Sequence, residues 1–292
     1  MANFKFIVNP VAARGRCSEA AQIVEEICRQ REMDFDIVYT DRPKQAIELA
    51  AQARNNFECV VAVGGDGTIN EVMNGLVGGK TSLGIVPVGT GNDLIRAIPV
   101  PVNIEEAIDC LIAFQTKKID IGKAWNRYFC NGLGIGFDAW VVKSTLSVKK
   151  LRGTAIYLYS VLKTIRTYEP PLVRLRYNDV DRSERFYLIT VGNGISLGGG
   201  FKLTPMAVID DGLFDLTIIR DLKKREVIHN LVSVFSGKHI YLEQVTTDRT
   251  TALTLESEPG FAAHADGELL SLNIHSMKVQ ILPGAIDVVV KA

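Results

Sequence analysis

The 292-residue sequence lacks any apolar run long enough to cross a membrane, since a spanning helix needs about 20 predominantly apolar residues. Its first residues, MANFKFIVNP, hold an apolar stretch that is too short for a signal peptide. The formal net charge is zero, so no global field attracts nucleic acid or an anionic membrane. We therefore expect a cytoplasmic protein with no nucleic-acid partner, which meets a membrane only from the water side.

Cysteine is also scarce, with five residues that are scattered and show no CxxC spacing. Disulfide frameworks use even numbers of cysteines in oxidising compartments, and structural zinc sites use closely spaced pairs. The sequence therefore predicts neither, and a reducing cytosol fits. Internal repeats and low-complexity linkers are absent as well, and the length favours two domains.

The pattern of apolar and polar residues differs between the first and second parts of the chain. In the first part, short apolar segments at 4–8, 35–39, 59–63 and 83–88 alternate with helical patterns, which predicts a parallel sheet with right-handed crossovers. After about residue 118, apolar and polar residues alternate in many segments. This alternation is typical of antiparallel strands with one face exposed to solvent. Helical stretches at 139–167 and 224–236 interrupt them. We expect an α/β domain over 1–120 and a mostly antiparallel β-sandwich over 121–292, whose last segment is free to return to the first domain.

Glycine-rich turns follow two successive predicted strands, GGDG at 64–67 and GTGND at 89–93. Ligands of open parallel sheets bind beyond the carboxyl ends of the strands, and glycine lets backbone N–H groups approach phosphate oxygens. A helix predicted from Thr68 adds free N–H groups and the positive end of its dipole. Asp66 would repel a bare phosphate, but Mg²⁺ between the two groups removes the conflict. The turns predict a nucleotide–Mg²⁺ site.

A tight turn without a ligand is the alternative for either loop alone. Two such loops at successive strand ends, each with an aspartate, favour the ligand site. The motif is neither a Walker P-loop, since GK[ST] is missing, nor the spaced GxGxxG of dinucleotide folds. Without a P-loop lysine, Arg14 and Arg16 are the candidate cations for phosphate, and ordinary solvated surface is the alternative for both.

Five motifs occur in order over residues 8–268: VNPVAARGR, VVAVGGDGTINEVMNG, GIVPVGTGNDLIRAI, DDGLFDLTII and HADGE. Together they closely resemble the bacterial diacylglycerol kinase-like lipid kinases, relatives of the sphingosine kinases. NAD kinases share only the GGDG core; the Asn70-Glu71 continuation and GTGND indicate the lipid kinases. The resemblance implies a NAD kinase/diacylglycerol kinase-like α/β nucleotide domain and a β-sandwich lipid domain, with the active site in the cleft between them.

The resemblance also implies roles for particular residues. Asp66 would serve the catalytic Mg²⁺, and Glu268 would be the general base that takes the proton from a lipid hydroxyl. A second, structural metal would use the Asp211 carboxylate and the carbonyls of Val208 and Leu213. The implied ATP-binding residues are Asn9, Pro10, Thr40, Gly64, Gly65, Asp66, Gly67, Thr68, Asn70, Glu71, Gly89, Thr90 and Asn92.

Several of these residues have simpler interpretations. Asp266-Gly267 is a good hairpin turn pair, which would leave Glu268 on the surface, and Asp211-Gly212 is a similar pair. His264 is expected to be structural. A basic stretch next to an apolar helix fits a membrane-surface face or a solvated charge run over a buried helix; it comprises Lys143, Lys149, Lys150 and Arg152.

One departure from the resemblance is Ala13, where related kinases usually have glycine. If the position needs a positive φ, alanine costs roughly 1 kcal/mol there. The function that we expect is an ATP- and Mg²⁺-dependent lipid kinase, with diacylglycerol as the first candidate acceptor and phosphatidic acid as product; ceramide-like, phosphatidylglycerol-like and polyprenol acceptors stay open. The alternatives are a kinase with a soluble acceptor such as NAD, and a non-catalytic nucleotide- or lipid-binding relative. We expect a lipid substrate as partner, which the protein would meet by transient peripheral contact with the inner membrane surface. A homodimer is the second expected partnership, because edge strands would permit one.

Overall fold

The computed structural model describes residues 2–148, 151 and 154–291. The chain forms two compact units: unit 1 comprises 1–121 with 283–292, and unit 2 comprises 122–282. The boundary expected at residue 120 lies one residue from this division, and the last segment of the chain belongs with unit 1.

A parallel ladder forms the sheet of unit 1. Its strands are β1 (Asn3–Val8), β2 (Asp34–Tyr39), β3 (Cys59–Gly64), β4 (Ser82–Pro87) and the end of β13 (Glu268–Val289). The order is β13-β4-β3-β1-β2, and each of these neighbouring pairs is parallel. Every residue of β3 and β4 is buried, as expected of central strands that are covered on both faces. Most other strand pairs of the chain are antiparallel.

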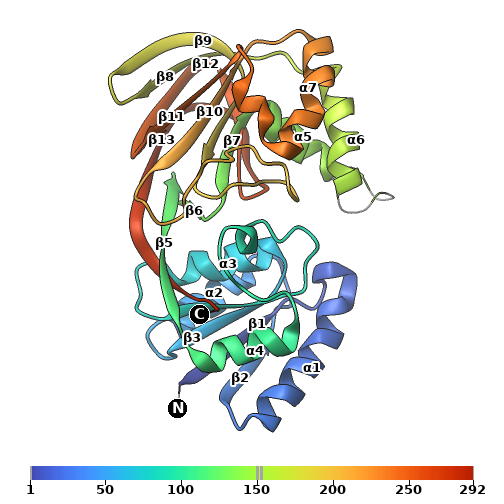
Figure 1. Cartoon of the computed structure of the whole chain (residues 1–292), viewed down its shortest axis with the longest axis vertical. Coiled ribbons are helices and arrows are strands. Elements are labelled where there is room, and N and C mark those ends of the chain that lie inside the picture. Colours follow the sequence, from blue (N-terminus) through green and yellow to red (C-terminus); the bar gives the residue numbers. More distant parts are fainter. Residues whose placement is uncertain (1, 149–150, 152–153, 292) are drawn as a thin grey trace. The chain divides into compact units, whose positions relative to one another are not determined.

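Two pairs of helices pack against this sheet (Figure 1): α1 (Arg16–Gln30) with α4 (Ile104–Ala113), and α2 (Gln45–Ala53) with α3 (Asp66–Leu76). The buried residues of α1 include Cys17, Ala21, Val24 and Cys28, spaced as one helical face. Helices α2 and α3 lie in close contact, because a Cβ on Gly75 would stand 2.4 Å from the Ile47 carbonyl oxygen. Helix α3 begins two residues before Thr68, from which the sequence predicted it.

Antiparallel strands build unit 2. They are β6 (Arg127–Phe129), β7 (Gly132–Gly136), β8 (Leu172–Tyr177), β9 (Val180–Gly192), β10 (Phe214–Arg220), β11 (Val245–Thr250), β12 (Ala252–Ala265) and the start of β13, while β5 (Thr116–Ala124) runs in from unit 1. The main order is β11-β10-β9-β7-β12-β13, and β8 pairs with both β9 and β12. Apolar side chains from most of these strands form one core cluster, in which Phe129 and Phe214 stack with ring centroids 5.6 Å apart.

Three helices gather on one side of the unit 2 strands (Figure 1): α5 (Phe137–Thr145), α6 (Thr154–Ile165) and α7 (Lys224–Ser236). The helical stretch expected over 139–167 is therefore two helices, α5 and α6, while α7 has the predicted bounds. Lys149, Lys150 and Arg152, singled out above as part of a basic stretch, lie outside the described residues. No described helix combines the length and the apolarity that a membrane crossing requires.

Candidate functional site

The loops after four parallel strands lie next to one another at one edge of the unit 1 sheet. The Asn9 N–H donates to the Val63 carbonyl (3.3 Å), and the Thr40 N–H donates to the Val8 carbonyl (2.9 Å). The Val88 N–H donates to the Gly64 carbonyl (2.8 Å). The strand ends that the sequence singled out are thus neighbours in space, as the parallel order requires.

The two glycine loops contact each other backbone to backbone. A Cβ on Gly89 would stand 2.7 Å from the Cα of Gly65, so a side chain at Gly89 would force the loops apart. Gly67 differs, because a Cβ there would meet nothing within 4 Å. Gly67 is exposed in the first turn of α3, whose N-cap residue Gly65 supplies no side-chain cap. The first N–H groups of α3 therefore lie beside open space, where an anion can approach.

Asp66 joins the two loops. Its Oδ1 accepts a hydrogen bond from the Asp93 N–H (2.7 Å). Burial raises the pKa of the Asp66 carboxyl, the nearby Asp93 carboxylate raises it further, and backbone N–H groups of residues 92–94 oppose the shift. A divalent cation beside Asp66 would favour the ionised carboxylate. The sequence predicted Asp66 as a metal ligand but did not predict this link between the loops.

In the loops after β1 and β4, two buried amide oxygens have no hydrogen-bond partner among the described residues, namely Asn9 Oδ1 and Asn92 Oδ1. Buried polar atoms are nearly always paired in proteins, so these two acceptors are open to a bound ligand or water. Amide oxygens suit Mg²⁺ and also accept from hydroxyl or amino groups of a nucleotide. Both residues follow strands of the ladder, and Asn92 has a left-handed φ of 54°. The donor set therefore fits Mg²⁺–ATP.

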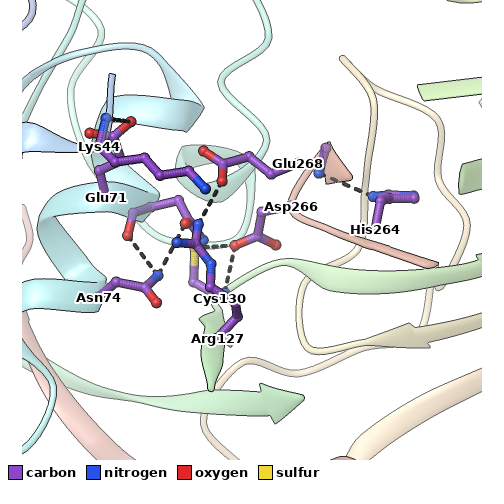
Figure 2. A network of polar contacts seen from close by, with 10 residues as sticks. Lys44, Glu71, Asn74, Arg127, Cys130, His264, Asp266 and Glu268 are labelled. Atoms are coloured by element: carbon purple, nitrogen blue, oxygen red, sulfur yellow. Dashed lines mark hydrogen bonds and ion pairs between the residues drawn. The ribbon is translucent and has the colours of Figure 1, made fainter. Parts of the chain in front are cut away.

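Other residues implied to bind ATP have structural contacts. Glu71 Oε1 accepts from the Lys44 N–H (3.2 Å) at the N-cap of α2 (Figure 2). Asn70 is buried, and the Asn74 amide donates to its carbonyl and side-chain oxygens at 2.9 and 3.0 Å. Thr40 and Thr68 are buried as well, whereas Thr90 is exposed. Glu71 thus links α3 to the start of α2, whereas the Asn70–Asn74 contact lies within α3.

The first loop, after β1, begins with the partly buried Pro10. Ala13 lies in a 3₁₀ helix (Ala12–Gly15), a right-handed conformation that alanine adopts without penalty. Gly15 is the residue with a positive φ, at 89°, so the departure at Ala13 carries no backbone cost. Arg16 is exposed at the start of α1, and the side chain of Arg14 lies outside the described part of the structure.

In unit 2, the turn between β12 and β13 is held by Asp266. Asp266 and Gly267 both have positive φ, at 46° and 81°, as a two-residue hairpin turn requires. The Asp266 carboxylate accepts the backbone N–H of Cys130 at 2.8 Å (Figure 2), and it also accepts those of Asn131 and Gly132 at 2.9 Å each. The sequence predicted the turn, but this anchoring to the start of β7 has no signal in the motif.

Glu268 is the first residue of β13, and its Oε2 lies 2.6 Å from a terminal nitrogen of Arg127 (Figure 2). Both side chains are partly buried, at 30% and 17% exposure. His264 is buried; its Nδ1 accepts from the Gly267 N–H (3.2 Å), and its Nε2 lies 2.8 Å from Asp138 Oδ2. These contacts fit the structural role expected of His264. Arg127 was missed, because one arginine in a three-residue strand has no distinctive sequence pattern.

Comparison with known proteins identifies the chain's family. The family described as Diacylglycerol kinase catalytic domain matches residues 3–124, and the YegS C-terminal NAD kinase beta sandwich-like domain matches residues 132–290. A diacylglycerol kinase of Staphylococcus saprophyticus is 32% identical over 224 residues, which covers 76% of this chain and 73% of the relative. The chain belongs to the diacylglycerol kinase and YegS-like lipid kinase family.

Other relatives match nearly the whole length of this kinase. A YegS-like lipid kinase of Chromohalobacter salexigens is 29% identical over 280 residues, covering 93% of this chain and 89% of the relative. The crystal structure of a diacylglycerol kinase from Bacillus anthracis str. Sterne shares the fold at TM-score 0.75 and 22% identity, and covers 99% of this chain and 97% of that one. A second solved chain from the same organism gives 0.80 and 25% with the same coverage. Kinases of this family use ATP as substrate and usually a divalent metal.

The segment expected to hold a structural metal contains an ion pair in this kinase. Asp211 Oδ1 accepts the Leu213 N–H (3.0 Å), and its other oxygen pairs with Arg249. The Arg249 Nε lies 3.5 Å from Asp215 Oδ2. A metal bound by Asp211 with the carbonyls of Val208 and Leu213 would have to displace this guanidinium, so the metal there stays a prediction. Within the described residues, no three His, Cys, Asp or Glu side chains group so as to hold a metal by themselves.

Unit 2 of the kinase also contains an apolar cavity of about 110 Å³. Helices α5, α6 and α7 and the strands beneath them line it, with Phe137, Tyr157, Phe201 and Leu231 among the wall residues. Its few polar neighbours include Asp138 and His239, and burial lowers the pKa of His239 and so favours the neutral ring. The cavity therefore suits hydrocarbon rather than a charged or sugar-like group.

Proposed function

We propose that this kinase is an ATP- and Mg²⁺-dependent lipid kinase that transfers the γ-phosphate to a lipid hydroxyl, with diacylglycerol as acceptor and phosphatidic acid as product. One observation carries the nucleotide half of the proposal. Two glycine loops meet at the carboxyl edge of a parallel ladder, Asp66 joins them, and the unpaired oxygens of Asn9 and Asn92 lie at the same edge.

In the proposed site, unit 1 binds and orients ATP. The open space beside Gly67 and the free N–H groups of α3 receive phosphate oxygens. Asp66, with the amide oxygens of Asn9 or Asn92, would hold Mg²⁺, which supplies neutralisation of phosphate charge during transfer. Phosphoryl transfer depends mainly on positioning and charge neutralisation, and these residues provide both without a P-loop lysine.

Glu268 of unit 2 is the proposed general base, which accepts the proton of the attacking lipid hydroxyl at a carboxylate oxygen. Arg127, at 2.6 Å, restricts the orientation of this carboxylate. Asp266, two residues earlier, fixes the turn from which Glu268 projects. Arg127 and Asp266 are therefore positioning residues in this proposal.

The lipid assignment is supported by the apolar cavity of unit 2 and by the names of the relatives. At about 110 Å³ the cavity is smaller than the roughly 300–1,000 Å³ of typical ligand sites. Entry of an acyl chain would require α7 to move outward. This helix contains no fully buried residue, and Val227, Leu231 and Val234 pack partly buried against the core cluster beneath it.

The test is transfer of radiolabelled γ-phosphate to a panel of lipids in mixed micelles with Mg²⁺, followed by organic extraction. Wild type should label a lipid, Asp66→Asn and Glu268→Gln should not, and Glu258→Gln, an exposed carboxylate change on β12, should behave as wild type. Label found only in NAD or a soluble alcohol would replace the lipid with a soluble acceptor. ATP binding without transfer to any acceptor would indicate a non-catalytic relative.

A further inference from the structure

Helix α7 is apolar on two sides. Val227, Leu231 and Val234 line the cavity, a spacing of four and three residues that defines one face. Ile228 and Val232 form a neighbouring stripe that is 53% and 76% exposed. The fold of unit 2 uses the first stripe and leaves the second in contact with solvent.

Helices α5 and α6 repeat this arrangement beside α7. On α6, Tyr157 and Val161 line the cavity, while Leu158 and Leu162, again four residues apart, are 40% and 45% exposed. On α5, Trp140 is exposed, and the Lys143 ammonium lies 4.7 Å from the centre of its ring. Single exposed apolar residues are ordinary, but a group on adjoining helices marks an interaction surface.

The charges on these helices are mostly positive. Lys143, Lys163 and Arg225 are exposed. The acidic side chains of the same helices have partners within the fold, since Asp138 lies 2.8 Å from the His264 ring and Glu226 accepts the Lys223 N–H (2.8 Å). The chain as a whole has zero net charge, so this basic character is local to the helices.

We propose that the outer faces of α5, α6 and α7 form a surface that docks on an anionic lipid bilayer. The docking surface comprises Trp140, Leu158, Leu162, Ile228 and Val232, flanked by Lys143, Lys163 and Arg225. Apolar residues flanked by Lys and Arg are typical of helices that lie in the membrane interface. A second copy of the chain fits less well, because two such faces would bring like charges together.

The inference rests on the proposed function, and it explains how a bilayer lipid reaches the cavity. The helices that carry the docking surface also form the cavity wall through their opposite faces. Docking would place the inner apolar stripe of α7 one helix diameter from the lipid. An acyl chain could then enter beside α7 without crossing water.

Vesicle sedimentation tests the surface with the full-length protein. Wild type should bind phosphatidylcholine vesicles that contain about one quarter phosphatidylglycerol more tightly than pure phosphatidylcholine vesicles. Val232→Asp and Leu162→Asp should each weaken binding about tenfold or more. Each change removes an apolar side chain that would contact the bilayer, and it places a negative charge against the negatively charged vesicle surface. Leu172→Asp, on β8 at 50% exposure, is the matched control and should bind as wild type. Lys163→Glu should weaken binding about tenfold on anionic vesicles only.

Activity on a short-chain diacylglycerol dissolved as monomers separates docking from catalysis, and all four variants should keep wild-type rates on it. Wild type that fails to bind vesicles, or Asp variants that bind as wild type, would overturn the docking surface. So would Val232→Asp that converts a dimer to a monomer while vesicle binding is unchanged. Vesicle binding that the variants lose, with no lipid phosphorylated by wild type, would support the surface and refute the proposed function instead.

Discussion

Replacing Gly67 with alanine separates a phosphate site from a turn that serves folding alone. Gly67 is exposed in the first turn of α3, does not require a positive φ, and has nothing within 4 Å of an added Cβ. Alanine should therefore leave the free energy of unfolding unchanged or raise it by about 0.5–1 kcal/mol, through helix propensity and reduced unfolded-state entropy.

The same substitution, Gly67→Ala, should weaken nucleotide binding. In the proposed site, the space beside Gly67 is where a phosphate oxygen approaches the N–H groups of α3. A methyl group there would displace the phosphate and cost at least one charge-assisted hydrogen bond, about 1.5–3 kcal/mol. We expect Gly67→Ala to weaken Mg²⁺–ATP binding about 10- to 100-fold while its melting temperature stays at or above that of wild type.

Calorimetric titration with a nonhydrolysable ATP analogue, alongside thermal unfolding, measures both quantities. Gly89→Ala is the comparison, because its Cβ would stand 2.7 Å from the Gly65 Cα. This overpacking should lower the free energy of unfolding by about 1–3 kcal/mol. We therefore expect Gly89→Ala to lose stability and Gly67→Ala to lose nucleotide affinity alone. Wild-type nucleotide affinity in Gly67→Ala would refute the phosphate site and leave the GGDG turn with a folding role only.

Three further measurements address other parts of the site. Glu268→Gln should lower kcat by about two to four orders of magnitude with nucleotide affinity retained; a near-normal kcat would remove Glu268 as the base. The raised pKa of Asp66 means that its contribution to stability is largest at acidic pH and declines as pH rises through that pKa, because the folded state disfavours the charge. Mg²⁺–ATP binding needs the ionised form and should weaken as pH falls through the same pKa, and Asp66→Asn should abolish this dependence. Arg249→Met removes the cation paired with Asp211 and should lower the melting temperature by a few degrees. If the melting temperature of wild type is the same in Mg²⁺ and in EDTA, the structural metal at Asp211 is refuted.

Much of the fold followed from patterns that depend only on local physics. The apolar segments before Asn9 and Gly65 are short runs that form strands, β3 wholly buried and β1 with its apolar side chains buried, and the intervening helices follow from spacing. Helix starts were less accurate. Helix α3 begins at Asp66, directly after the chain leaves β3, rather than at Thr68 as the sequence predicted.

The contacts within the site escaped prediction because they join residues far apart in the sequence. Asp66 could be recognised as a carboxylate among glycines, but its bond to the Asp93 N–H depends on the register of β3 against β4. Arg127 and Glu268 are 141 residues apart, and neither a three-residue strand nor a hairpin end predicts such a pair. A sequence read locally can therefore identify the chemical groups without showing which of them touch.

Asp266 shows the consequence for interpreting a motif. As a turn residue next to a glycine, it can be explained without any further role, yet its carboxylate accepts three successive N–H groups at the start of β7. An asparagine would form the same turn but has one acceptor oxygen instead of two. The aspartate is therefore explained by the β7 contact rather than by the turn, and through it the position of Glu268 depends on a strand more than 130 residues earlier in the chain.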